Sequence, residues 1–89
     1  FSLMKPTAYL INTARGGVVN QHDLYEALRE GKIAGVGLDV FNPEPPAPDL
    51  PLLSLPNVIV TPHVGGTTVE CNLIMATTVA ENVLRVLAG

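Results

Sequence analysis

Three short runs of aliphatic and β-branched residues stand out along this chain because they contain almost no polar alternation. They cover residues 9–13, 33–40 and 57–61, and each has glycine or proline close by. Continuous apolar runs of this length are typical of parallel strands, whose two faces are both covered. We therefore predict three parallel strands that are buried on both sides.

The segment between the first two runs has the spacing of a short amphipathic helix. We predict a helix from about Gln21 to Glu30, with Asn20 as its N-cap and Gly31 at its end. The side chains expected on its buried side are Leu24, Ala27 and Leu28.

A longer helix is predicted from about Thr68 onward. Residues 67–70 fit a capping box, in which a threonine hydroxyl and the Glu70 carboxylate satisfy free amides. Most apolar residues of this helix fall on one broad stripe, namely Val69, Leu73, Ala76, Val79, Ala80, Val83, Leu84 and Leu87. Three further apolar residues lie off the stripe and suit a second contact surface: Ile74, Met75 and Val86.

The order strand, helix, strand, loop, strand, helix predicts a right-handed α/β unit with a parallel sheet. Residues 41–56 contain six prolines and are expected to be irregular loop. The first strand would leave an apolar open edge, which complete domains avoid. Phe1–Pro6 is interpreted as the last turn of a helix that begins before the chain. We therefore expect the 89 residues to be part of a longer protein.

The amino-acid composition of the chain limits the kinds of partner that we expect. The net charge of −3 favours neither nucleic acid nor an anionic membrane as a partner. The apolar runs are too short to span a bilayer, although 47% of the residues are hydrophobic. A single cysteine, Cys71, allows no internal disulfide and is compatible with the reducing cytoplasm. No metal site is expected.

One polar residue follows the end of each predicted strand: Arg15, Glu44 and His63. The carboxyl edge of an open parallel sheet is where ligands bind. Arginine is suited to holding a carboxylate, and a carboxylate beside a histidine adjusts the proton affinity of the imidazole. Singly, the three could be a surface ion-pair partner, a solvated loop acid and a structural histidine, but three consecutive strand ends predict a site for a small acid.

The residues after His63 add a second candidate feature. Val64, Gly65 and Gly66 precede the second helix, where free amides with glycine access can receive an anion such as a pyrophosphate or a carboxylate. Asp39, at the end of the second strand, is a further carboxylate at the same predicted edge.

Three segments resemble the signatures of the D-isomer-specific 2-hydroxyacid dehydrogenases: MKPTAYLINTARGGVVNQHDLYEAL, GKIAGVGLDVFNPEP and LPNVIVTPHVGGTT. The resemblance covers almost all of the chain and includes the spacing of an Arg–Glu–His triad. It implies the last three strands of a Rossmann-like parallel sheet with flanking helices. Residues 1–89 would be the C-terminal portion of a NAD(P)-binding domain, without its N-terminal half and without the substrate domain.

The resemblance also implies roles for individual residues. Arg15 would bind the carboxylate and carbonyl of a small 2-oxo acid, His63 would donate or accept the proton, and Glu44 would favour the charged imidazole. The nicotinamide end of NAD or NADP would be lined by Thr13, Ala14, Arg15, Asp39, His63, Val64, Gly65 and Gly66.

Three functions remain open at this stage. The first is an NAD(P)-dependent oxidoreductase acting on D-2-hydroxy acids, with a cytoplasmic, homodimeric parent and with the 89 residues inactive alone. The second is a dinucleotide-sensing binding protein similar to the corepressors that share this fold. The third is a structural remnant that binds no cofactor.

Overall fold

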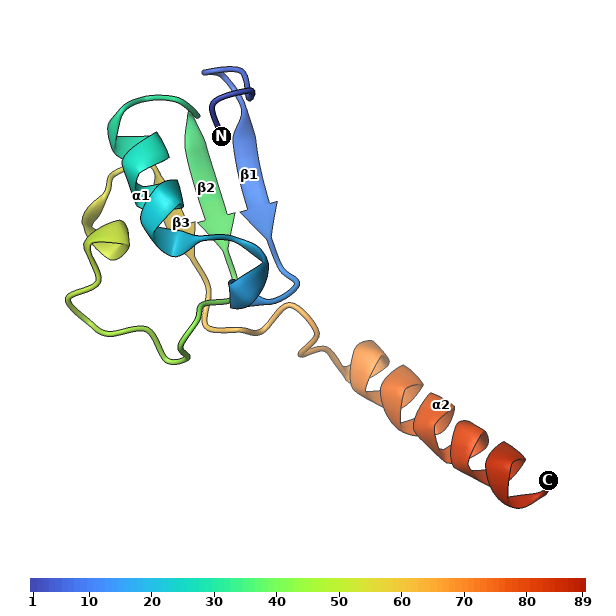
Figure 1. Ribbon diagram of the computed structural model, residues 1–89. Coiled ribbons are helices and arrows are strands. Elements are labelled where there is room, and N and C mark those ends of the chain that lie inside the picture. The colour runs from blue at the N-terminus through green and yellow to red at the C-terminus, as the bar shows by residue number, and fades with distance from the viewer.

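The computed structural model describes all 89 residues, Phe1–Gly89. A small α/β unit is followed by a separate long helix (Figure 1). The elements in chain order are β1 (Tyr9–Asn12), the 3₁₀ turn η1 (Gly16–Val18), α1 (Gln21–Arg29), β2 (Gly35–Leu38), the 3₁₀ turn η2 (Pro51–Ser54), β3 (Val58–Val60) and α2 (Val69–Leu87).

The three strands form one parallel sheet in the order β1-β2-β3, as predicted. Leu10 pairs with Val36, and Val36 pairs in turn with Val58. The strands are shorter than the apolar runs that predicted them. Ile33 and Val40 lie outside β2 but are only 1% exposed, so burial rather than strand pairing accounts for the apolar ends of that run.

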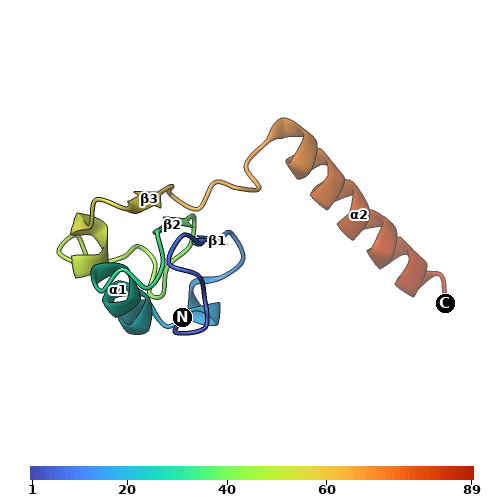
Figure 2. The ribbon, with the colours of Figure 1, turned by 90° about the horizontal axis from the view of Figure 1, so that it is seen from above.

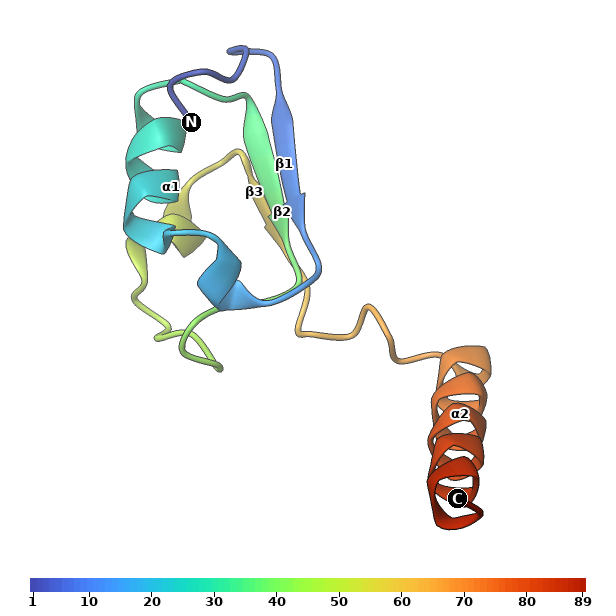
Figure 3. The ribbon, with the colours of Figure 1, turned by 45° about the vertical axis from the view of Figure 1, so that its right-hand side comes forward.

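Helix α1 and η2 pack on one face of the sheet (Figure 3). The α1 prediction is confirmed, because the side chain of Asn20 accepts a hydrogen bond from the Asp23 amide and Gly31 has a positive φ of 70°. Burying this face supplies most of the hydrophobic stabilisation of the fold. The core cluster comprises Leu24, Leu28, Ile33, Val36, Leu38, Phe41 and Leu52.

The opposite face of the sheet is not covered by any part of this chain. Tyr9, Ile11 and Ile59 are 72%, 67% and 74% exposed. The prediction of two covered faces is therefore confirmed for β2, whose residues are buried or nearly so, but is wrong for β1 and β3. The Tyr9 side chain lies over Gly35, and the Ile11 side chain lies over Gly37. A Cβ added to either glycine would lie 3.0 Å from the side chain above it.

Helix α2 points away from the α/β unit and buries none of its residues (Figures 1 and 2). The radius of gyration is 17.4 Å, whereas about 12 Å is expected for a compact chain of this length. The apolar stripe predicted on α2 is present, but no part of this chain buries it. None of the helices combines the length and the apolar character that crossing a bilayer requires.

Three local predictions need correction. The cap of α2 is Thr68, whose hydroxyl accepts from the Cys71 amide, so Cys71 rather than Glu70 occupies the third helical position. Phe1 and Met4 are joined by a turn with a 3.0 Å hydrogen bond, not by a helix. The proline-rich segment is not wholly irregular, because η2 forms within it and buries Leu52.

Candidate functional site at the carboxyl edge of the sheet

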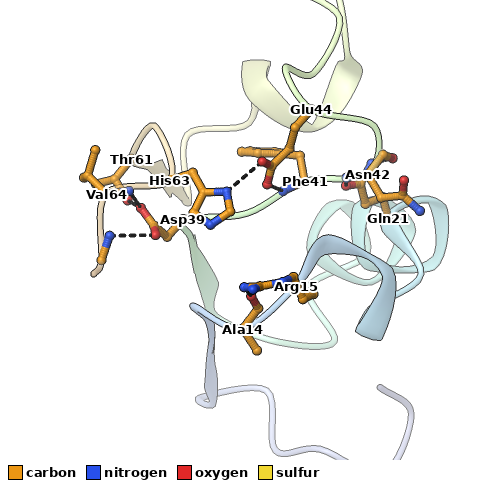
Figure 4. A network of polar contacts seen from close by, with 11 residues as sticks. Ala14, Arg15, Gln21, Asp39, Phe41, Asn42, Glu44, Thr61, His63 and Val64 are labelled. Carbon is orange, nitrogen blue, oxygen red and sulfur yellow. Dashed lines mark hydrogen bonds and ion pairs between the residues drawn. The ribbon is translucent and has the colours of Figure 1, made fainter. Parts of the chain in front are cut away.

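The loops that follow the three strands meet at one edge of the sheet (Figure 4). Arg15 lies in the loop after β1, Glu44 in the segment after β2, and His63 in the loop after β3. Because all three strands run in the same direction, their ends bring together side chains that are far apart in sequence.

His63 and Glu44 form a direct pair. The imidazole Nδ1 of His63 lies 2.7 Å from Oε2 of Glu44, while Oε1 of Glu44 accepts a 2.9 Å hydrogen bond from the Phe41 amide. The hydrogen bond from His63, followed by that from Phe41, holds the pKa of Glu44 below its ordinary value. Glu44 is therefore ionised near neutral pH, and Nε2 is the ring nitrogen of His63 that this pair leaves free.

Asp39 makes contacts that the sequence did not predict. Its carboxylate accepts from the Thr61 hydroxyl at 2.5 Å and from the amides of Val64 and Gly65 at 2.9 Å each. The bond from Thr61, followed by the two amide bonds, keeps the pKa of Asp39 below its ordinary value. The expectation that the amides of Val64 and Gly65 are free to receive an external anion is therefore wrong, because Asp39 already occupies them.

Arg15 is positioned by its neighbour Asn12, a buried polar residue at the end of β1. The Asn12 side chain donates to the Arg15 carbonyl at 3.0 Å and accepts from the Ala14 amide at 3.1 Å. The exposed guanidinium of Arg15 donates from Nη1 to the Ala14 carbonyl at 2.6 Å. Its charge contributes to the lowered pKa of Glu44, but it forms no hydrogen bond with Glu44 or His63.

Two close contacts join the Arg15 loop and the start of α1 to the Glu44 segment. A Cβ added to Gly16 would overlap the backbone carbonyl of Phe41, so only glycine fits there. Gln21 donates to the Asn42 carbonyl at 3.1 Å and accepts from the Asn42 amide at 2.8 Å. The sequence does not predict these supporting residues, because pairing between distant loops leaves no periodic signal.

Two hollows lie at this edge. The larger, of about 540 Å³, is bordered by His63 and Glu44 and has mainly apolar walls: Asp39, Phe41, Pro45, Pro46, Leu53, Val60, Thr61 and Pro62. The smaller, of about 150 Å³, opens on the uncovered sheet face and is lined by Ile11, Thr13, Gly37, Leu38, Asp39, Ile59 and Thr61.

Several of the predicted site residues do not reach these hollows. Five of them line neither hollow: Ala14, Arg15, Val64, Gly65 and Gly66. Thr13 borders only the smaller hollow, and Asp39 borders both. No three histidine, cysteine, aspartate or glutamate side chains are grouped as a metal site would require.

Comparison with known proteins gives a consistent family assignment. The profile of the D-isomer specific 2-hydroxyacid dehydrogenase NAD binding domain matches residues 1–65. A glyoxylate reductase of Korarchaeum cryptofilum is 54% identical over 86 residues, which are 97% of this chain and 26% of that protein. The chain thus spans about a quarter of that relative's length.

Solved structures agree with the sequence matches. The TT0316 protein of Thermus thermophilus is 49% identical with a TM-score of 0.80, over 97% of this chain and 27% of that one. An NADPH-dependent glyoxylate/hydroxypyruvate reductase of Sinorhizobium meliloti, solved with NADP and malonate, is 48% identical with a TM-score of 0.67, over 74% of this chain and 20% of that one.

Proposed function

This chain belongs to the D-isomer specific 2-hydroxyacid dehydrogenase family, within its NAD binding domain, and on that basis we propose that it carries the reactive side chains of an NAD(P)-dependent oxidoreductase. The proposed reaction interconverts a small 2-oxo acid and the corresponding D-2-hydroxy acid. The observation that carries the proposal is the 2.7 Å contact between His63 and Glu44 at the carboxyl edge of the sheet. A histidine fixed by a carboxylate is suited to proton transfer.

Each of the three residues has a distinct proposed role. In reduction, Nε2 of His63 donates a proton to the oxygen that was the carbonyl of the 2-oxo acid; in oxidation it takes the hydroxyl proton. Glu44 orients the ring through Nδ1 and stabilises its charged form. Arg15 holds the substrate carboxylate and polarises the keto carbonyl of the 2-oxo acid. Only one of its five N–H donors is used by the Ala14 carbonyl, so the others remain for the substrate.

The smaller hollow fits the nicotinamide end of the cofactor. Gly37 has no side chain to fill it, Ile11 and Ile59 form apolar walls suited to a planar ring, and Thr13 and Thr61 are polar groups at its border. When bound, the nicotinamide supplies or accepts the hydride. NAD and NADP differ only at the adenosine end, so a hollow that holds the nicotinamide end suits both.

We also propose that residues 1–89 are the C-terminal portion of a NAD(P)-binding domain, accompanied in the whole protein by the rest of that domain and by a substrate domain. Two apolar surfaces support this: the uncovered sheet face and the stripe on α2. The similarity to the Thermus thermophilus structure covers 97% of the chain and therefore includes most of α2. A homodimer in the cytoplasm is part of the same proposal.

A chimera tests this function directly. Residues of this chain would replace the 86 matching residues in the glyoxylate reductase of Korarchaeum cryptofilum, to which they are 54% identical. Reduction of glyoxylate and hydroxypyruvate would be followed through the absorbance of NADH and NADPH. We expect turnover in the chimera, and a loss of about 10²–10⁴-fold in kcat for His63→Ala.

The outcome separates the enzyme from its alternatives. A folded chimera that binds NADH but turns over neither acid would contradict the proposal and favour a dinucleotide-sensing protein. Turnover that does not change in His63→Ala would remove His63 from the proposed proton transfer. His22→Ala is the matched control, because His22 is an exposed histidine in the first turn of α1.

A further inference from the structure

The loop that carries His63 has an unusual backbone. His63 has a φ of 56°, in the left-handed region that residues with a Cβ seldom adopt. Such a conformation costs free energy and persists only where neighbouring contacts hold it. The ring of His63 must nevertheless keep one orientation if Nδ1 is to stay 2.7 Å from Glu44.

Asp39 provides contacts on both sides of His63. It accepts from the Thr61 hydroxyl before His63 and from the amides of Val64 and Gly65 after it. Charge-assisted hydrogen bonds of this kind are stronger than neutral ones. Asp39 is only 6% exposed and belongs to the segment directly after β2, so it is a rigid point from which to hold the loop.

After His63, the only other backbone hydrogen bond in the loop is a local turn from the Thr67 amide to the Val64 carbonyl at 2.9 Å, which does not reach the sheet. The Thr61 amide donates to the Leu38 carbonyl at 2.9 Å, and the His63 amide donates to the Thr61 carbonyl at 3.1 Å. Beyond Gly65 the chain continues into α2, none of whose residues is buried. The contacts that tie the residues after His63 to the sheet are therefore those with Asp39.

We propose that Asp39 is a positioning residue, whose carboxylate clamps Thr61, Val64 and Gly65 so that the imidazole of His63 remains directed at Glu44. Three of the roughly four hydrogen bonds that a carboxylate can accept are used inside the loop. This role goes beyond the expectation that Asp39 is one of the residues lining the nicotinamide end. For catalysis, the inference rests on the proposed function; for the loop conformation it does not.

The conformational part is tested on the 89-residue chain by amide hydrogen exchange followed by NMR. In Asp39→Asn, the amides of Val64 and Gly65 should exchange about tenfold faster or more, because the charged acceptor is lost. The Val36 amide, which donates to the Asn57 carbonyl at 3.0 Å, reports whether the sheet is intact and should not change. Asp49→Asn removes the same charge from an exposed loop and is the control.

A second variant keeps the test decisive if Asp39→Asn does not fold. Thr61→Val removes only the hydroxyl that donates to Asp39 and keeps the size of the side chain. It should speed exchange at Val64 and Gly65 by a smaller factor and shift the NMR signal of the His63 ring. Unchanged exchange at both amides in a folded Asp39→Asn or Thr61→Val chain would overturn the inference.

Kinetics in the chimera separate positioning from direct cofactor contact. A positioning role predicts that Asp39→Asn lowers kcat about tenfold or more while the KM for NADH changes little. A raised KM for NADH with unchanged kcat would contradict it and favour a direct contact with the nicotinamide. If the unmutated chimera is inactive, the proposed function fails, whereas the exchange experiment still decides the role of Asp39 in the loop.

Discussion

The imidazole of His63 lies 2.7 Å from the carboxylate of Glu44, although 19 residues separate them along the chain. The two belong to loops after different strands, β3 and β2, which are neighbours in the sheet. Glu44 is held in turn by the Phe41 amide. The pair is therefore positioned by sheet topology and by local backbone contacts together.

Glu44→Gln should separate the charge of Glu44 from its hydrogen bond. Glutamine is nearly the same size and can still bond His63, but it cannot stabilise a charged imidazole. In the chimera we expect the rate of glyoxylate reduction to fall, because the neutral amide cannot balance the positive charge of an imidazole that donates a proton. Glu26→Gln, which removes a half-buried carboxylate of α1 that pairs with Arg29, is the control; an unchanged rate of reduction in Glu44→Gln would contradict the coupling.

The free energy of unfolding should depend on pH through the carboxylates of Asp39 and Glu44. Hydrogen bonds lower the pKa of Asp39, chiefly through Thr61, and that of Glu44, chiefly through His63. As the pH falls, the unfolded chain therefore takes up protons before the folded chain does. The stability that these groups contribute is present above about pH 4 to 5 and is lost as the pH falls below it.

Denaturant unfolding between pH 6 and pH 3 measures this effect. The midpoint should drop with falling pH in the unmutated chain, and should drop less in Asp39→Asn and in Glu44→Gln. Equal pH dependence in all three chains would show that neither carboxylate is responsible.

Substituting Gly16 or Gly17 by alanine tests how closely the Arg15 loop packs against the Glu44 segment. In Gly16→Ala the new Cβ would overlap the Phe41 carbonyl, so backbone must move. We expect a loss of about 3 kcal/mol in the free energy of unfolding. In Gly17→Ala the nearest atom, of Asn42, is 3.7 Å away, and the change should stay within about 0.5 kcal/mol.

Leucine truncations test whether α2 stands apart from the core. Leu24 is fully buried, so Leu24→Ala should cost about 2–5 kcal/mol in the free energy of unfolding. Leu84 is 66% exposed on α2, so Leu84→Ala should change it by about 0.5 kcal/mol or less. Urea unfolding of the 89-residue chain measures both, and similar losses would mean that α2 packs on the α/β unit in solution.

The 89 residues alone should bind NADH weakly. They span 26% of the Korarchaeum cryptofilum relative, and the hollow on their sheet face is proposed to hold only the nicotinamide end. Calorimetric titration should therefore give a dissociation constant well above micromolar, and no turnover of 2-oxo acids is expected. Micromolar binding by the isolated chain would contradict the proposal that further segments complete the cofactor site.

The sequence by itself determined the elements, the parallel sheet and the strand ends that carry Arg15, Glu44 and His63. These follow from local rules, because apolar runs form strands, an Asn20 cap and Gly31 delimit α1, and parallel strands bring their ends to one edge. The same rules also identified the amphipathic stripe of α2.

Only the tertiary structure decided what those parts touch. Continuous apolar runs predicted two buried faces, yet Ile11 and Ile59 are exposed, because hydrophobicity in a sequence does not say which segment provides the cover. The amides of Val64 and Gly65 were predicted to be free, and Asp39 occupies them, because a contact across 25 or 26 residues depends on how two loops pack. Long-range packing of this kind has no period along the chain, and so the three-dimensional fold alone determines it.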